Sequence, residues 1–228
     1  MRFTDHYIRR RPPPAAAGNT PAQTDSLRRT VGLLLATQGD VSPAAEGLAY
    51  LTYYERHSAQ PQWLERAARL LAGAQSIPPL AAAKLKYYQN DPAGAWAALA
   101  PLAQQPGPHT VEMYLWESEL LALLNRPADA QAALDTALAH YPAHPELTLK
   151  RVGLLFASRQ PSASVLSQAR RLLVAALDQK PDDKRLLANL GFVALNQRNP
   201  EEARRYLQAA LALDPLYAPA LESIRLVE

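Results

Sequence analysis

Two series of residues recur in step along the second half of the chain, and this periodicity constrains the fold more than any other feature. The patterns DAQAALDTAL, QARRLLVAAL and EARRYLQAAL share an alanine at their second place: Ala130, Ala169 and Ala203. A proline follows each alanine at one fixed distance: Pro142, Pro181 and Pro215. Both series are spaced by 39 and then 34 residues. Such self-similarity predicts a repeat protein, in which each unit buries its apolar face only against its neighbours.

The composition predicts that each unit is helical. Hydrophobic residues make up 48% of the chain, and most of them are Ala and Leu, which are strong helix formers. Only 9 of the 228 residues are Gly, and β-branched runs typical of strands are absent. We therefore predict an all-α fold of about eleven or twelve helices without strands, stacked as antiparallel pairs.

A small residue lies in the middle of the helix that precedes each repeated alanine: Ser118, Gly153 and Gly191. Two helices approach to about 8 Å only where a side chain is nearly absent. We therefore expect Gly191 to face Ala203 within a helix pair, and Ala210 to admit the next helix. The turn SRQPSASVLSQ is longer than the other turns and accounts for most of the longer first period.

These residues resemble the tetratricopeptide repeat, a helix-turn-helix unit of about 34 residues. The matching positions are Leu187, Leu190, Gly191, Ala203, Tyr206, Ala210 and Pro215, whereas Ala194 stands where the family usually has an aromatic residue. A further copy is expected over 25–58, with Val31-Gly32 and Ala44, and a shorter one in KLKYYQNDPAGAWAALAPL, with Ala83, Ala95 and Leu102. Residues 59–80 fit no repeat cleanly.

The resemblance implies a right-handed α-solenoid whose first helices line a concave, partner-binding groove. We expect a solenoid over 24–228, with the clearest repeats at 109–215 and a capping helix at 217–227. Residues 1–23 are rich in Pro, Ala and Arg and lack apolar periodicity, so we expect a disordered basic tail that acts as a linker.

Motifs for catalysis or cofactors are absent from the sequence. It has no cysteine, no phosphate-cradling Gly loop and no G-x-S-x-G or H-E-x-x-H motif. His140 and His144 are four residues apart, but Pro142 between them argues against a helical metal site. We therefore expect no enzymatic activity, no cofactor and no metal. No apolar stretch is long enough for a membrane span, and we expect a cytoplasmic protein.

Charges are segregated along the chain. Residues 91–149 have one basic and seven acidic residues, a net charge of −6, whereas residues 150–205 have eleven basic and five acidic residues, a net charge of +6. Opposite potentials on adjacent repeats suit either a ligand with its own charge asymmetry or head-to-tail self-association.

The basic half contains the principal candidate groove. By the resemblance, first-helix positions there are occupied by Lys150, Arg185, Asn189, Phe192 and Asn196. Lys150 and Asn189 match two positions at which one subset of the family clamps a carboxylate, but Leu154 replaces a required Asn. We therefore predict a generic groove for an anionic peptide. The alternative is an ordinary solvated helix surface.

A second candidate contact consists of Lys84, Tyr87 and Tyr88, because tyrosine gives a large contact area at little entropic cost. The alternative is that these tyrosines pack on a neighbouring helix. We assign the other prominent aromatic residues to packing: Tyr53, Tyr54, Trp63, Trp96 and Trp116.

Two classes of function remain. In the first, the chain is a non-enzymatic scaffold or adaptor that binds a protein or peptide segment in its groove. In the second, it is a helical-repeat protein that binds RNA. Nucleic acid is the less favoured partner, because the residues after 23 have 20 basic and 20 acidic residues and RNA-binding surfaces are usually continuously basic.

Overall fold

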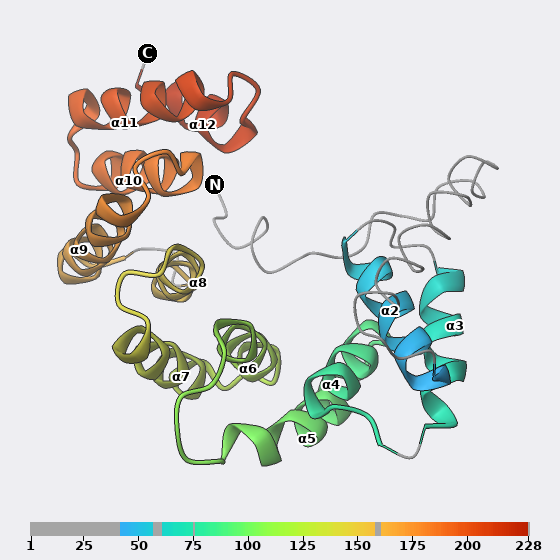
Figure 1. The fold of residues 1–228 in the computed structure, drawn as a ribbon. Coiled ribbons are helices and arrows are strands. Elements are labelled where there is room, and N and C mark those ends of the chain that lie inside the picture. The colour runs from blue at the N-terminus through green and yellow to red at the C-terminus, as the bar shows by residue number, and fades with distance from the viewer. Residues whose placement is uncertain (1–41, 57–60, 75, 158–160, 228) are drawn as a thin grey trace. The chain divides into compact units, whose positions relative to one another are not determined.

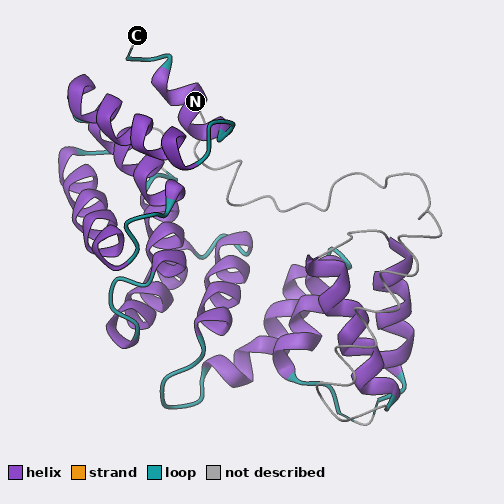
Figure 2. Ribbon diagram, turned by 45° about the horizontal axis from the view of Figure 1, so that its top comes forward, coloured by secondary structure: helices purple, strands orange, loops and turns teal. Residues whose placement is uncertain are grey.

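A computed structural model describes residues 42–56, 61–74, 76–157 and 161–227, and helices are the only regular secondary structure in these ranges (Figures 1 and 2). The helices are α2 (Pro43–Arg56), α3 (Pro61–Ala72), α4 (Pro79–Tyr88), α5 (Pro92–Ala103), α6 (Val111–Leu123), α7 (Pro127–His140), α8 (Pro145–Leu155), α9 (Ala163–Gln179), α10 (Lys184–Asn196), α11 (Pro200–Leu213) and α12 (Ala218–Ile224). The all-α prediction is confirmed. The tail at 1–23 and the helix expected from residue 25 lie outside the described residues.

The described helices form two compact units, α2–α5 and α6–α12. Within them, consecutive helices pack as pairs: α2 with α3, α4 with α5, α6 with α7, α8 with α9, and α10 with α11. The short helix α12 packs on α11 and α10, where Ala220 and Val227 join the core around Leu207.

The second helix of every pair contains a buried alanine and, four residues later, a buried leucine. These residues are at most 1% exposed: Ala67 and Leu71, Ala95 and Leu99, Ala130 and Leu134, Ala169 and Leu173, and Ala203 and Leu207. The leucine fills the space between the helices, and the alanine lets their backbones approach. The repeated packing unit is therefore present five times in the described chain.

Gly191 has the expected role in the pair α10–α11. A Cβ atom at Gly191 would lie 2.7 Å from Cγ of Leu207 and 3.4 Å from the carbonyl oxygen of Ala203. Gly153 does not have this role, since a Cβ atom there would meet nothing within 4 Å. The buried residue that precedes Ala169 at the corresponding place is Val152, so our assignment of Gly153 as the small residue was one position off. The long turn before α9 hides this register.

The N-terminal unit also corrects the repeat boundaries. The segment that fitted no repeat contains α3, which packs against α2. A Cβ atom at Gly47 would lie 2.8 Å from Cγ of Leu71, so Gly47 has the same relation to α3 as Gly191 has to α11. Within the described residues, α2 is thus the first helix of a pair, whereas the sequence predicted it to be the second helix of a copy at 25–58.

Short turns connect the two helices within three of the pairs, α4–α5, α6–α7 and α10–α11. The second residue after the end of the first helix adopts a positive φ in each: 64° at Asn90, 58° at Asn125 and 59° at Arg198. The next residue donates its N–H to a carbonyl five residues back, as Asn199 does to Ala194 at 2.9 Å. This is the C-terminal motif that ends a helix tightly. Side chains then cap two of the three following helices: Asp91 caps α5, and Asn199 Oδ1 accepts from the N–H of Glu202 at 3.3 Å at the start of α11.

Candidate partner-binding surface

The first helices of the C-terminal unit form a continuous surface. Helix α6 contacts α8, and α8 contacts α10, whereas the second helices α7, α9 and α11 approach one another less. The first helices therefore lie on the inner side of this unit, with the second helices outside them (Figure 1). Side chains that join α6, α8 and α10 consequently lie along one face.

Lys150 of α8 forms an ion pair with Glu119 of α6. The side chains of Lys150 and Glu119 are 12% and 14% exposed, so the pair is largely withdrawn from solvent. At such a site the attraction between the charges is screened less than at the surface, and removing one partner leaves the other charge uncompensated. Lys150 therefore links two first helices as well as carrying charge on the inner face.

Arg185 of α10 has a similar linking role. It donates to Glu146 of α8 at 2.7 Å and to Asp183 at 2.8 Å. Hydrogen bonds from the Arg185 guanidinium to Asp183 raise the pKa of Arg185, against the lowering effect of burial, and Glu146 adds to the rise. Asp183 is 4% exposed and fixed, whereas the side chain of Glu146 is 46% exposed. Arg185 is thus held by the buried carboxylate of Asp183 and also pairs with the half-exposed carboxylate of Glu146.

The other three predicted groove residues differ in accessibility. Phe192 is partly buried and packs edge-to-face against Phe156, with ring centroids 5.5 Å apart. Asn189 is 5% exposed and donates to the carbonyl of Arg185 at 2.7 Å. Asn196 is exposed and donates to the carbonyl of Phe192 at 2.9 Å. Lys150 thus lies on α8, Arg185 and Phe192 lie on α10, and Asn189 is buried.

The second candidate cluster belongs to the N-terminal unit and centres on Glu55. Lys84 Nζ and the Tyr88 hydroxyl donate to the two oxygens of this carboxylate at 3.1 and 3.2 Å. Tyr88 also packs edge-to-face on Tyr54 and Tyr87. Burial, and then the charge of Glu55, raise the pKa of Tyr88 above its usual range. Lys84 and Tyr88 are therefore engaged in joining α4 to α2.

Packing of the remaining aromatic residues follows the expectation where the structure gives their contacts. Tyr53 and Tyr54 are buried. Trp63 stacks on Tyr50 at a centroid distance of 5.9 Å and meets Tyr53 edge-on. Trp96 and Trp116 are partly buried. The contacts of Trp63 with Tyr50 and Tyr53 thus join α3 to α2.

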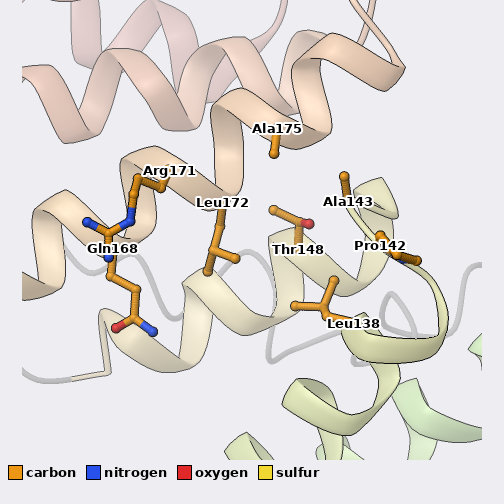
Figure 3. A pocket seen from close by; sticks show the side chains of 8 residues that line it. All are labelled: Leu138, Pro142, Ala143, Thr148, Gln168, Arg171, Leu172 and Ala175. Atoms are coloured by element: carbon orange, nitrogen blue, oxygen red, sulfur yellow. The ribbon is translucent and has the colours of Figure 1, made fainter.

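Sequence reasoning missed a pocket of about 360 Å³ in the C-terminal unit (Figure 3). Eight residues line the pocket. Leu138, Pro142 and Ala143 come from the end of α7 and the turn after it, Thr148 comes from α8, and α9 contributes Gln168, Arg171, Leu172 and Ala175. Residues 114, 148 and 187 occupy equivalent places in their repeats, so a comparison of repeats contains a signal for the pocket: a small residue, Thr148, where the others are large.

Searches for other kinds of site gave two negative results for the described part of the chain. No group of three or more His, Cys, Asp or Glu side chains there is arranged to hold a metal ion. None of the helices described is both long enough and apolar enough to cross a membrane.

Comparison with known proteins agrees with the geometry. The family model of the tetratricopeptide repeat matches residues 185–217. Among solved structures, the chain is similar to YrrB, described as a TPR protein with an unusual peptide-binding site, with 16% identity, a TM-score of 0.55, and coverage of 87% of this chain and 99% of that one. No curated protein sequence matches.

The chain is also similar in structure to yeast Tom70, with 16% identity and a TM-score of 0.63 over 92% of this chain. It spans only 43% of that protein. Stacked helix pairs of this kind define an all-helical repeat protein. The chain therefore has the fold of tetratricopeptide-repeat proteins, and its residues 185–217 match the family model of that repeat.

Proposed function

We propose that this chain is a non-enzymatic scaffold that binds an extended, acidic segment of a partner protein along the inner face of α6, α8 and α10. The observation that carries the proposal is the row formed by Lys150 of α8 and by Arg185 and Phe192 of α10, two first helices that contact each other. The peptide-binding site for which YrrB is known lends support at the level of the fold. Recognition by an array of this kind uses charged and aromatic anchors on a rigid surface.

Arg185 is the strongest anchor of the row. Its bond to the buried Asp183 fixes the guanidinium, so little side-chain freedom is lost when a ligand binds. A ligand carboxylate can replace the half-exposed Glu146 while Asp183 stays in place. Phe192 and Phe156 offer an apolar surface next to this charge. Lys150 contributes a second positive charge, and Asn196 contributes an exposed amide.

The direct test is binding of an array of acidic 15-residue peptides to the full chain. We expect the double variant K150E/R185E to weaken binding of selected peptides at least tenfold, or about 1.4 kcal/mol. R69E/R205E, with the same change in net charge at exposed positions of the second helices α3 and α11, is the matched control and should leave affinity unchanged. Equal affinity of the double variant and the wild type would contradict the proposal.

A charge swap separates contact from stability at Lys150. In E119K/K150E the ion pair between α6 and α8 is restored with its charges exchanged. If Lys150 contacts the ligand, the swap recovers the melting temperature and leaves binding weak. Recovery of binding together with the melting temperature would show that Lys150 only supports the helices. In that case Tyr87→Ala tests whether the N-terminal cluster with Lys84 and Tyr88 is the contact surface.

The RNA alternative is distinguished by salt. Binding of a poly(U) oligonucleotide should fall steeply between about 50 and 200 mM salt because counterions are released from phosphates. A peptide held partly by apolar contacts loses affinity only modestly over this range. Tight, steeply salt-dependent binding of poly(U), lost in K150E/R185E, would favour the RNA alternative over the scaffold.

A further inference from the structure

The pocket in Figure 3 exists because one repeat lacks a large side chain. The residue four places before the small residue of the first helix is Tyr114 in α6 and Leu187 in α10, and both are buried. The equivalent residue in α8 is Thr148. Its shorter side chain leaves space between α7, α8 and α9, and the pocket opens at this place.

Thr148 is fully buried, and its hydroxyl has no hydrogen-bond partner among the described residues. An apolar occupant does not pair with this hydroxyl, so the fit of such an occupant depends on the other walls of the pocket. The other walls near it are apolar, including Leu138, Leu172 and Ala175. Exposed Arg171 lies with Gln168 to one side (Figure 3). The pocket thus suits a bulky apolar side chain with polar groups beside it.

A second departure from the repeat occurs in the turn between α11 and α12. The residue after the repeated proline is Ala143 in one turn and Asp182 in the next, but it is Leu216 in this turn. Leu216 is 85% exposed, the largest fraction among the exposed large hydrophobic residues of the described chain. Asp214 lies two residues before it and forms an ion pair with Lys184 at 2.6 Å, with its own side chain 32% exposed. The turn therefore presents an apolar knob, Leu216, next to a partly exposed ion pair.

We propose that the pocket around Thr148 is a self-association site that receives Leu216 of a second copy of this chain. A leucine has the right size, because Leu187 fills the equivalent space in α10. Arg171 beside the pocket can share the partly exposed carboxylate of Asp214, which pairs with Lys184 in the free chain. Helix α10 packs between α9 and the helices α11 and α12, so the knob lies a helix pair beyond the pocket and the contact joins two molecules.

The contact is heterologous, since the knob of one molecule enters the pocket of another. Such contacts propagate head to tail rather than closing as a two-fold dimer. It is also independent of the proposed peptide groove. Thr148 and Lys150 are two residues apart in α8 and thus about 200° apart around the helix. The charge-swap variant E119K/K150E should therefore associate like the wild type.

Sedimentation velocity of the full chain over increasing concentration is the test. We expect the weight-average sedimentation coefficient of the wild type to rise with concentration. Thr148→Leu fills the pocket and Leu216→Asp removes the knob, so each variant should stay monomeric. Thr148→Leu should also melt higher than the wild type, because it replaces an unpaired hydroxyl with apolar packing. Ala175→Leu narrows the pocket from an exposed position of α9 and is a second variant should Thr148→Leu fail to fold.

Mixing gives the decisive result. Thr148→Leu keeps its knob, and Leu216→Asp keeps its pocket, so an equimolar mixture should form a one-to-one dimer and nothing larger. Leu226→Asp changes another hydrophobic residue, 66% exposed, and is the matched control that should associate like the wild type. A wild type that stays monomeric, a mixture that stays monomeric, or association that survives in both single variants would overturn the proposal.

Discussion

Helices α10 and α11 pack more closely along their length than helices α8 and α9, although both pairs place a buried alanine and a buried leucine on the second helix. The first helices differ at two equivalent places. Gly191 and Leu187 of α10 correspond to Val152 and Thr148 of α8. A β-branched valine at the crossing keeps two helices apart where glycine lets them meet. The comparison shows that one residue at the crossing sets how closely a pair packs.

The ends of the two pairs differ as well. A short turn joins α10 to α11, whereas a longer segment joins α8 to α9. At the start of the first helix, Asp183 of α10 caps through its side chain, and the equivalent His144 of α8 does not. The pocket lies in the pair with these departures. Proteins violate local packing rules mostly at functional sites, which is why we place the self-association site there.

The largest expected effect is at Gly191. In Gly191→Leu the new side chain would start 2.7 Å from Cγ of Leu207, so the pair α10–α11 must separate. Overpacking of this kind should lower the free energy of unfolding by about 3 kcal/mol. Urea denaturation measures the loss. A variant as stable as the wild type would show that the small-residue position has been misread.

Asp183→Asn should have the next largest effect. Burial would raise the pKa of Asp183, but hydrogen bonds from Arg185 outweigh it, and the pKa is lowered. A lowered pKa in the folded state means that the carboxylate stabilises the protein above its unfolded pKa of about 3.9 and ceases to do so as pH falls through the folded value. The variant should therefore lose about 2 kcal/mol at pH 7 and less as the pH falls below about 4.

A measured stability difference between Asp183→Asn and the wild type that is constant from pH 7 to pH 3 would contradict this linkage. Asp178→Asn is a matched control, because Asp178 is exposed. It should change neither the stability at pH 7 nor the acid midpoint appreciably.

His144→Asp is predicted to stabilise the protein, because it gives α8 the cap that Asp183 gives α10. His144 already has the extended backbone of a capping residue, with φ −62° and ψ 122°, and makes no side-chain cap bond. A new cap should add about 1 kcal/mol. Thermal unfolding of this variant, beside Thr110→Ala at the existing cap of α6, checks the prediction. The two changes should have opposite signs.

The smallest effect is expected at Arg198, whose φ is 59°. The equivalent turns have Asn90 and Asn125, a residue type that tolerates this left-handed conformation better than arginine. Arg198→Asn should therefore gain about 0.5 kcal/mol. Asn125→Arg, the reverse change in an equivalent turn, should lose a similar amount. If both variants were more stable than the wild type, or both less stable, the left-handed backbone conformation of the turn would not explain the changes.

Sequence reasoning predicted the helix pairs where the spacing between their landmark residues stays constant. Gly191 and Ala203 are twelve residues apart, as are Ser118 and Ala130, and both pairs were found. Gly47 and Ala67 are twenty residues apart, so a search for the regular period missed the pair α2–α3. A variable turn length changes the period without changing the packing.

The candidate site could be predicted only in part. First-helix positions for Lys150 and Arg185 followed from the repeat. Their ion pairs did not, because Glu119 and Glu146 lie 31 and 39 residues earlier in the chain and meet them only when the helices stack. The burial of Asn189 likewise depends on packing against neighbouring helices. The position of a residue in the repeat could therefore be predicted from the sequence. Its exposure to solvent could not, because exposure depends on how the helices stack.

The central claim is that one place in the first helix, where it crosses the second, sets how closely the pair packs, so that the same substitution has opposite effects at that place and one residue away from it. Thermal unfolding of Gly191→Ala and Gly153→Ala tests it most directly, because the same methyl group is added to the middle of two equivalent helices. Alanine should stabilise at Gly153 by about 0.5–1 kcal/mol, through helix propensity in open space. At Gly191 it should destabilise, because the methyl group would lie 2.7 Å from Leu207. Shifts of the same sign in the two variants would contradict the claim.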